Sequence, residues 1–485
     1  MEQKKFTKIV ATISDKRCDV DFIRQLYEEG MNVVRMNSAH LNREGFLKII
    51  NNVRTVSRRI AILMDTKGPE VRTTVAENDA IEFKTGDLVK IIGDVNLMST
   101  KKSIAVNYPF FARDLNVGDH ILIDDGEIDF QVISKDQNCT NCLTCEVLND
   151  GTIGSRKSVN VPGVRINLPS LTEKDKENIL FAIEQNLDFI AHSFVRSKQD
   201  LVDIQKILDD HNSTIKIISK IENQEGVDNI DEIIQYSYGI MVARGDLGIE
   251  VPQERIPGIQ RRLIRKCVKA HKPVIVATQM LHSMIENPRP TRAEVNDIAN
   301  AIYYRTDALM LSGETAYGKY PVEAVRTMAK IALEAEKTKM PENDIPIEFK
   351  DGDATSFLAH AAVQAGKHID ISAIITDTFS GLTARYLASY RGTDPIIAFC
   401  YAERASRELA LSYGVYSFYK EELVGNEKMY FVSLLQNILE REIIFPDDKL
   451  CYLSGPISGS YGTTFLEINT AKTLLSEINN YTLSK

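Results

Sequence analysis

Eight short apolar runs recur along the chain, and they constrain its fold more than any other feature. The runs cover residues 8–14, 32–37, 61–65, 188–194, 214–222, 238–246, 273–279 and 307–314. Buried parallel strands read as near-continuous runs of Val, Ile and Leu, and most of the intervals hold one helical pattern. This alternation predicts a (β/α)8 TIM barrel, an α/β fold, built from residues 1–69 and 169–339.

Polar residues gather where these runs end, which is where barrel enzymes place their active sites. Four pairs are two positions apart: Arg35 with Asn37, Lys220 with Glu222, Arg244 with Asp246, and Ser312 with Glu314. Because strand side chains two apart share a face, each pair is expected to project together. Other polar residues at these ends are Asp65, Lys67, Ser193, Thr278 and Gln279. One pair alone could be an ordinary solvated strand end, but agreement among seven strands favours a functional rim.

The mixture of charges at this rim indicates phosphoryl chemistry. Glu222 and Asp246 end adjacent strands and offer the hard oxygen ligands that suit Mg²⁺. Arg35 and Lys220 add positive charge, and cations around a divalent metal fit a phosphorylated substrate. The alternative is that the two carboxylates form structural salt bridges with Lys220 and Arg244.

Two further segments lie outside the barrel. Residues 70–168 read as short β segments with frequent turns, which predicts an inserted all-β lid domain over the rim. Residues 340–485 predict a separate C-terminal α/β domain after the linker KMPENDIP. In that domain Thr378, Ser380, Gly381 and Thr383 form a candidate anion site, which the loop 454–464 could close. Ordinary helix capping by Ser380 is the alternative.

Composition excludes several function classes. A net charge of −9 and a pI near 5.6 argue against nucleic acid as a partner. Because no apolar run is long enough for a membrane span or a secretory signal, a cytoplasmic protein with no membrane partner is expected. Cys139, Cys142 and Cys145 have metal-like spacing without a fourth ligand nearby, so we expect strand cysteines without a metal.

Several long motifs, in order, closely resemble the pyruvate kinase family over essentially the whole chain. The matching stretches are GMNVVRMNSAH (30–40), MDTKGPEVRT (64–73), GSRKSVNVPG (154–163), IISKIENQEGV (217–227), GIMVARGDLG (239–248), ATQML (277–281), RPTRAEVNDIANAI (289–302) and LSGETAYGKYP (311–321). The resemblance implies phosphoryl transfer from phosphoenolpyruvate to ADP, giving pyruvate and ATP, the last step of glycolysis. It also implies Mg²⁺ (or Mn²⁺) and K⁺ as cofactors and a homotetramer.

The resemblance also implies roles for individual residues. Arg35 would bind the transferring phosphoryl group, Lys220 would stabilise its charge, and Glu222 and Asp246 would hold Mg²⁺. The implied substrate-binding set continues with Ala243, Arg244, Gly245 and Thr278, and Ser312 and Glu314 would support a proton path to the enolate. The residues that match the family's nucleotide side are Asn37, His40, Arg72 and Lys157.

The implied K⁺ site contains one departure from the family pattern. Asn37, Asp65 and Thr66 match K⁺ ligands, and Glu70 matches the residue typical of K⁺-dependent members. The serine that normally reaches K⁺ is replaced by Ala39, so we expect K⁺ activation through a weakened site in which water or Ser38 substitutes.

The C-terminal loop resembles the sugar-phosphate effector pocket of regulated members, with Phe379 where some carry lysine. Two other functions remain as alternatives. One is another Mg²⁺-dependent barrel that handles an enolate, a lyase or aldolase, which would have no use for Lys157. The other is a catalytically silent sugar-phosphate-sensing scaffold, which would be expected to lose Lys220, Glu222 or Asp246, and the chain keeps all three.

Overall fold

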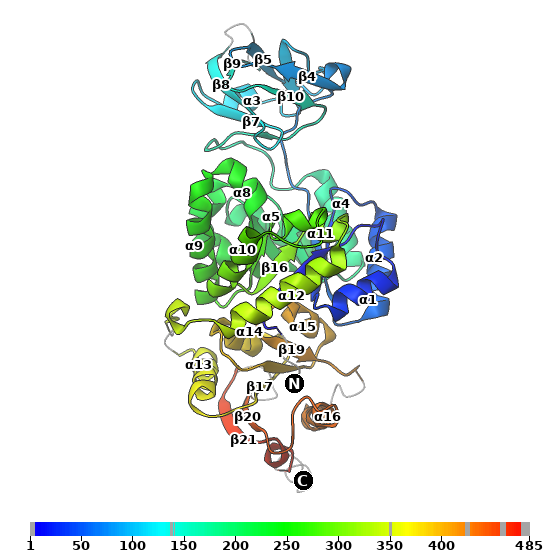
Figure 1. Ribbon diagram of the computed structural model, residues 1–485, viewed down its shortest axis with the longest axis vertical. Coiled ribbons are helices and arrows are strands. Elements are labelled where there is room, and N and C mark those ends of the chain that lie inside the picture. Colours follow the sequence, from blue (N-terminus) through cyan, green and yellow to red (C-terminus); the bar gives the residue numbers. More distant parts are fainter. Residues whose placement is uncertain are drawn as a thin grey trace.

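The computed structural model describes residues 5–135, 139, 141–348, 352–421, 427–455 and 462–476. Three bodies are stacked along the long axis: the barrel lies in the middle, the inserted domain above it and the C-terminal domain below it (Figure 1). No helix among the described residues is long and apolar enough to cross a membrane.

Eight parallel strands close the barrel in the order β1-β16-β15-β14-β13-β12-β3-β2. They are β1 (Lys8–Thr12), β2 (Val33–Asn37), β3 (Ala61–Asp65), β12 (Phe189–His192), β13 (Lys216–Ile221), β14 (Gly239–Ala243), β15 (Val274–Ala277) and β16 (Ala308–Leu311). All eight lie within the apolar runs of the sequence, so the barrel prediction is confirmed.

Helices surround these strands and cover their outer face with apolar side chains. They are α1 (Val20–Glu28), α2 (Arg43–Val56), α4 (Glu173–Glu184), α5 (Lys198–Asp210), α6 (Gln224–Asp228), α7 (Ile230–Tyr236), α8 (Arg244–Glu250), α9 (Ile256–Lys269), α10 (Arg292–Tyr303), α11 (Gly313–Ala316) and α12 (Pro321–Lys337). Single-turn 3₁₀ helices lie at Glu77–Asp79, Gln253–Arg255, His282–Ile285, Pro341–Asn343 and Leu409–Leu411.

The inserted domain is built from two sheets around its own apolar core. Its strands are β4 (Ala80–Phe83), β5 (Leu88–Gly93), β6 (Ser103–Val106), β7 (His120–Ile123), β8 (Ile128–Lys135), β9 (Cys142–Val147), β10 (Gly151–Gly154) and β11 (Val159–Asn160). The short helix α3 (Phe111–Asp114) is the one α-helix within it among the described residues. The β character predicted for this segment is therefore confirmed, with two helical turns added, α3 and the 3₁₀ helix Glu77–Asp79.

The C-terminal domain is a five-stranded sheet of order β19-β18-β17-β20-β21, covered by helices. Its elements are α13 (Ala354–His368), β17 (Ala373–Thr378), α14 (Leu382–Ser389), β18 (Ile396–Cys400), α15 (Glu403–Glu408), β19 (Val415–Phe418), α16 (Glu427–Glu440), β20 (Lys449–Ser454) and β21 (Phe465–Thr470). The predicted domain boundaries themselves remain predictions.

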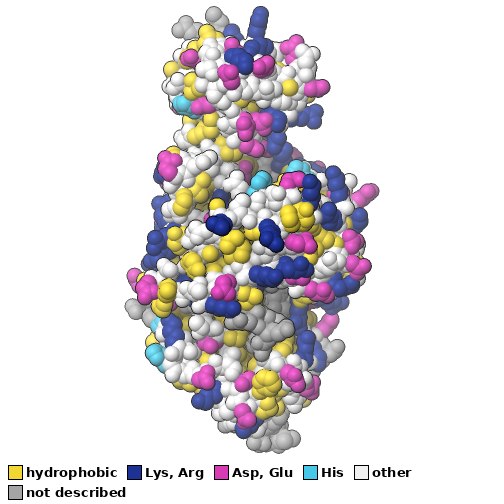
Figure 2. Space-filling model, in the orientation of Figure 1, with side chains coloured by type: hydrophobic (Ala, Val, Ile, Leu, Met, Phe, Trp, Pro, Cys, Tyr) yellow, Lys and Arg dark blue, Asp and Glu magenta, His cyan; other side chains and the backbone are white. Residues whose placement is uncertain are grey.

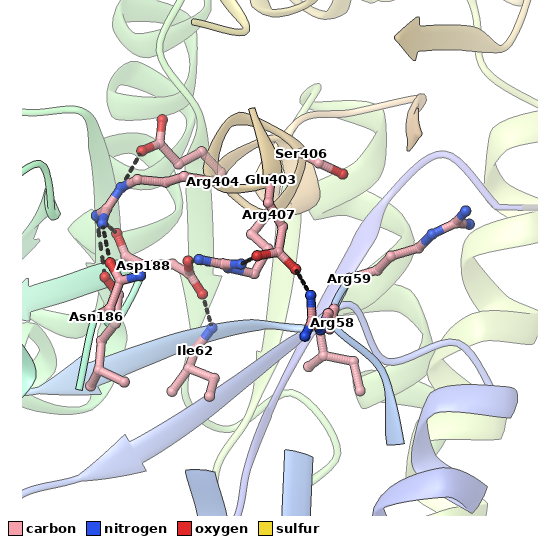
Figure 3. Close-up of polar contacts among 12 residues, drawn as sticks. Arg58, Arg59, Ile62, Asn186, Asp188, Glu403, Arg404, Ser406 and Arg407 are labelled. Carbon is pink, nitrogen blue, oxygen red and sulfur yellow. Dashed lines mark hydrogen bonds and ion pairs between the residues drawn. The ribbon is translucent and has the colours of Figure 1, made fainter. Parts of the chain in front are cut away.

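The C-terminal domain holds the lower end of the barrel through buried charges. Asp188, at the start of β12, is fully buried, and its carboxylate accepts from Arg407 Nε of α15 at 2.6 Å and from Ile62 N at 2.8 Å. Beside it, Arg404 donates to Asn186 Oδ1 at 2.9 Å (Figure 3). Leu411 of the same domain packs into the apolar cluster inside the barrel. The end opposite the rim is therefore closed by protein.

Candidate active site

Lys220 lies near the end of β13 with its ammonium surrounded by oxygen atoms. Its Nζ is 2.8 Å from Glu222 Oε1 and 3.1 Å from Asp65 Oδ1, and it donates to Ser193 Oγ at 2.7 Å. These groups come from the ends of three neighbouring strands, β13, β3 and β12. Because Lys220 is 9% exposed, the strand ends and not solvent fix the position of its charge.

Asp65 joins this ammonium to a second cation. Arg35 Nε donates to Asp65 Oδ2 at 2.7 Å, and Arg35 Nη1 donates to Thr12 Oγ1 at 3.1 Å. The two cations therefore share one carboxylate that is 1% exposed. Neither the role of Thr12 nor the contact of Ser193 with Lys220 was expected from the sequence, although both are polar residues at the end of an apolar run.

The pKa values at this cluster follow from burial and from these charges. Burial would lower the pKa of Lys220, but the carboxylates of Asp65 and Glu222 outweigh it and raise that pKa. Burial would raise the pKa of Asp65, but the charges of Arg35 and Lys220 lower it. For Glu222, burial outweighs the attraction of Lys220 and raises the pKa to about 7.

Two carboxylates have the properties of metal ligands. Glu222 Oε2 accepts from Phe194 N at 2.7 Å, while the buried Oε1, beside Lys220, receives no aligned hydrogen bond from the described residues. The Asp246 side chain forms no hydrogen bond or ion pair with the described part of the chain, and its charge acts on Glu222. Nowhere in the described part of the chain does a group of three or more His, Cys, Asp or Glu side chains lie close enough together to hold a metal ion. This donor set fits Mg²⁺, which typically takes one or two carboxylates and completes its shell with substrate oxygens and water.

The predicted pairing of Arg244 with Asp246 is wrong. Both residues lie in the first turn of α8 and not on a strand, and on a helix residues two apart do not face each other. Arg244 Nη1 instead pairs with Asp297 at 2.6 Å, and Nη2 donates to Thr278 O at 2.6 Å. Asp246 is thereby left available at the rim.

Thr278 has a backbone conformation that is costly for a β-branched residue. Its φ is 70°, in the left-handed region, and that of the next residue, Gln279, is 54°. Its Oγ1 accepts from Gly245 N at 2.8 Å and its carbonyl is held by Arg244. Such strain persists where the surroundings impose it, and it concentrates at functional sites.

Glu314 is buried and both of its carboxylate oxygens are used by the backbone. Oε1 accepts from Leu281 N at 3.1 Å and Oε2 accepts from Ser312 N at 2.8 Å. Glu314 therefore joins the loop after β15 to the loop after β16, and it fixes the backbone that carries Ser312.

Comparisons with known proteins decide the family of this site. A family model described as "Pyruvate kinase, barrel domain" matches residues 4–325, and "Pyruvate kinase, alpha/beta domain" matches residues 356–470. The chain belongs to the pyruvate kinase family. A pyruvate kinase of Borreliella burgdorferi is 48% identical over 472 residues, covering 96% of this chain and 98% of that protein. A pyruvate kinase of Geobacillus stearothermophilus is 44% identical over 98% of this chain and 82% of its own length.

A solved structure extends the likeness to three dimensions. The crystal structure of a pyruvate kinase from Cryptosporidium parvum superposes with a TM-score of 0.89 at 35% identity, over 97% of this chain and 96% of that chain. Membership in the pyruvate kinase family makes this chain an enzyme, a kinase and transferase. The roles of its individual residues are taken up below as proposals.

The residues expected on the nucleotide side are not all brought together. Arg72 pairs with Glu70 at 2.8 Å, and Lys157 pairs with Asp124 at 2.8 Å within the inserted domain, while His40 is exposed near the barrel rim. A cavity of about 430 Å³ lies between this domain and the barrel. Glu70, Asp125 and Asp246 are among the residues that line it.

The expected K⁺ residues lie together but are partly engaged elsewhere. Asp65 forms ion pairs with Arg35 and Lys220. Thr66 Oγ1 accepts a hydrogen bond from Ser193 N at 3.1 Å. Asn37 Oδ1 accepts one from Ala39 N, also at 3.1 Å. Ser38 is 7% exposed, and its hydroxyl has no hydrogen-bond partner among the described residues.

In the C-terminal loop, Thr378 Oγ1 accepts from Gly381 N at 2.9 Å, and the hydroxyl of Thr383 is 2.8 Å from that of Thr463. Gly381 (φ 74°) precedes α14, whose first turn has no side-chain cap, so the capping alternative for Ser380 is wrong. Residues 456–461 of the predicted closing loop lie outside the described residues.

The cysteine run contains a disulfide that was not expected from the sequence. Cys139 and Cys142 are joined to each other. Cys145 is a free, buried thiol whose pKa is raised by burial to about 12.

Proposed function

We propose that the rim transfers the phosphoryl group of phosphoenolpyruvate to ADP, giving pyruvate and ATP. The observation that carries this proposal is the cluster at Lys220. There the buried ammonium and the Arg35 guanidinium are both held by Asp65, and Glu222 lies beside the ammonium. Phosphoryl transfer needs positioning and charge stabilisation more than a nucleophilic side chain. The rim offers charged side chains that are held in position, which suits this kind of reaction.

Arg35 and Lys220 would act on the transferring group. Its transition state spreads negative charge over the equatorial oxygens, and fixed cations stabilise that charge without reorganisation. Asp65 and Ser193 orient the ammonium, and Thr12 orients the guanidinium. The cations are therefore in place before substrate arrives.

Glu222 and Asp246 would hold Mg²⁺ or Mn²⁺. A divalent ion there supplies charge neutralisation on the phosphoryl and carboxylate oxygens of the substrate. Glu222 Oε1 lies 2.8 Å from Lys220 Nζ but receives no aligned hydrogen bond from the described residues, and the Asp246 carboxylate has no ion pair among them. Both observations support this assignment.

The substrate carboxylate would bind at the start of α8. The backbone of Ala243, Arg244 and Gly245 opens this helix beside the Thr278 hydroxyl, and backbone N–H groups there point toward a bound anion. The Arg244 side chain would act indirectly, because it holds the strained Thr278 backbone. Glu314 would position Ser312 for the proton path to the enolate.

K⁺ would bind near Asn37, Asp65, Thr66 and Ser38. Glu70, which matches the residue typical of K⁺-dependent members, follows Thr66 by four positions in the sequence. The unpartnered hydroxyl of Ser38 supports the view that it supplies the oxygen that Ala39 lacks. Lys157 and Arg72 would reach the nucleotide together with Asn37 and His40 when the inserted domain closes as a lid. To contact the nucleotide, the Lys157 ammonium must exchange its ion pair with Asp124 for one with the ligand.

Four broader assignments complete the proposal. The domains would be residues 1–69 with 169–339, 70–168, and 340–485. A sugar phosphate would bind at Thr378, Ser380, Gly381 and Thr383, where the αL glycine and threonine hydroxyls offer donors. The chain would work in the cytoplasm as a homotetramer.

The test is pyruvate formation from phosphoenolpyruvate and ADP with Mg²⁺, measured once with K⁺ and once with a large organic cation in its place. Turnover that requires ADP and is stimulated by K⁺ is the expected result. Equal turnover in both salts would remove the K⁺ assignment, and absence of ADP-dependent turnover would refute the proposed reaction.

A further inference from the structure

Away from the rim, five cations project from the outer face of α9. They are Arg261, Arg262, Arg265, Lys266 and Lys269. The opposite face of the helix is apolar and packs on the barrel. Figure 1 places α9 at the outer edge of the barrel, and Lys and Arg side chains follow the same edge in the space-filling view (Figure 2).

These five side chains, with Gly258, line a surface hollow of about 450 Å³. No carboxylate lines it. A Cβ atom at Gly258 would meet no other described heavy atom within 4 Å, so the hollow is open at the first turn of the helix. The hollow is therefore a space bounded by cations on a chain whose net charge is −9.

The charges of the hollow are only partly compensated within the chain. Lys266 pairs with Asp231, Arg262 donates to Val227 O at 3.0 Å, and the Arg261 guanidinium lies 5.3 Å from the centroid of the Tyr304 ring. Arg265 and Lys269 have no carboxylate within ion-pair distance in the described part of the chain, although Arg265 is only partly exposed.

Helix stability does not account for the arrangement. Arg261 with Arg265, Arg265 with Lys269, and Arg262 with Lys266 are like-charge pairs four residues apart, which destabilise a helix. Lys266 and Lys269 gain from their place in the last turn, near the negative end of the helix dipole. That gain does not extend to the three arginines, and an anion bound among them would relieve their repulsion.

We propose that this hollow is a second anion site, which binds a polyphosphate group. Arginine forks match phosphate oxygens in pairs. Cations on successive turns are about 6 Å apart along the axis, so a single phosphate cannot meet them all, whereas a chain of phosphates can. The site is independent of the proposed reaction, because α9 carries none of the residues assigned to the rim.

The test is titration calorimetry, which measures the dissociation constant of inorganic tripolyphosphate for the full chain at low salt and without divalent metal. Arg265→Glu with Lys269→Glu is expected to weaken the binding to the hollow at least tenfold and to leave turnover unchanged. The matched control is Lys206→Glu with Lys330→Glu, two exposed lysines on α5 and α12, which makes the same change in net charge. The control is expected to bind within twofold of the wild type.

Two outcomes would overturn the proposal. One is that the wild type binds tripolyphosphate no more tightly than the Glu variant of the hollow, and the other is that the control variant loses as much affinity as that variant. The latter would indicate an effect of net charge alone. If the Glu variant does not fold, Arg265→Gln with Lys269→Gln removes both charges without reversing them and is expected to weaken binding in the same direction. Unchanged binding in a folded Gln variant would also refute the site.

Discussion

Ser193→Ala tests whether the Lys220 ammonium must be held by three oxygens. The Ser193 hydroxyl is buried, accepts from Lys220 Nζ at 2.7 Å and donates to Thr66 O at 2.6 Å. Alanine removes the neutral acceptor and leaves Lys220 with Asp65 at 3.1 Å and Glu222 at 2.8 Å. The ammonium is then drawn toward the two carboxylates and away from the phosphoryl group.

The size of the effect follows from the hydrogen bond that is lost. A hydrogen bond to a charged group contributes about 1.5–3 kcal/mol, which corresponds to a rate change of about 10-fold to 100-fold if it is lost in the transition state. Because two carboxylates still hold Lys220, the lower end is expected. We therefore predict a kcat about tenfold lower, with a smaller change in the KM for phosphoenolpyruvate.

Steady-state kinetics of pyruvate formation measure this effect, and Ser219→Ala is the matched control. Ser219 is also buried, precedes Lys220 on β13, and its hydroxyl is 2.5 Å from that of Ser237, away from the rim. Its loss is expected to lower stability and leave kcat within twofold, while Ser193→Thr keeps the hydroxyl and is expected to retain activity. An unchanged kcat in Ser193→Ala, or an equal drop in Ser219→Ala, would refute the reasoning.

Three further predictions concern the cation site, acid stability and the barrel floor. Ala39→Ser is expected to lower the K⁺ concentration needed for half-maximal activity, and an unchanged K⁺ titration would contradict the missing-ligand interpretation. His192 is fully buried and its pKa is lowered by burial from 6.5 to about 4, so the unfolded chain binds a proton first as the pH falls. Stability should fall between pH 6.5 and 4 by about 3 kcal/mol at about 1.4 kcal/mol per pH unit, and urea titrations should show a smaller loss in His192→Asn. Arg407→Met leaves a buried carboxylate short of a partner and should cost about 3 kcal/mol in urea unfolding, whereas Arg58→Met, at an exposed arginine of the same network, should cost less than about 1 kcal/mol; equal losses would contradict this.

The barrel was predictable because each strand is a local apolar run, and the rim because polar residues follow those runs. Lys220 and Glu222 are brought together as their spacing predicts. The predicted strand spacing is wrong for Arg244 with Asp246, because β14 ends at Ala243 and a helix begins at once. It is also wrong for Ser312 with Glu314, because β16 ends at Leu311 and Ser312 is the N-cap of α11. Periodicity alone does not locate these boundaries.

Long-range partners were not predictable from local patterns. The ion pair of Asp188 with Arg407 joins residues 219 positions apart, and no local sequence pattern around either residue predicts its partner. The salt bridge of Arg244 with Asp297 is of the same kind. Such contacts depend on how the layers pack, so they appear only with the fold, although they determine which rim carboxylate stays unpaired.

The charges of the rim support the proposal that a divalent metal binds there. Arg35 and Lys220 contribute two positive charges, and Asp65, Glu222 and Asp246 contribute three negative charges when ionised, so the cluster alone has a net charge opposite to that needed for a phosphorylated substrate. Asp65 cannot be omitted, because it fixes both cations. A divalent ion between Glu222 and Asp246 would reverse the sign of the cluster and occupy the oxygen of Glu222 that the described residues leave without an aligned donor. The carboxylate that positions the two cations is thus also the reason why the proposed metal would be needed to give the cluster a net positive charge.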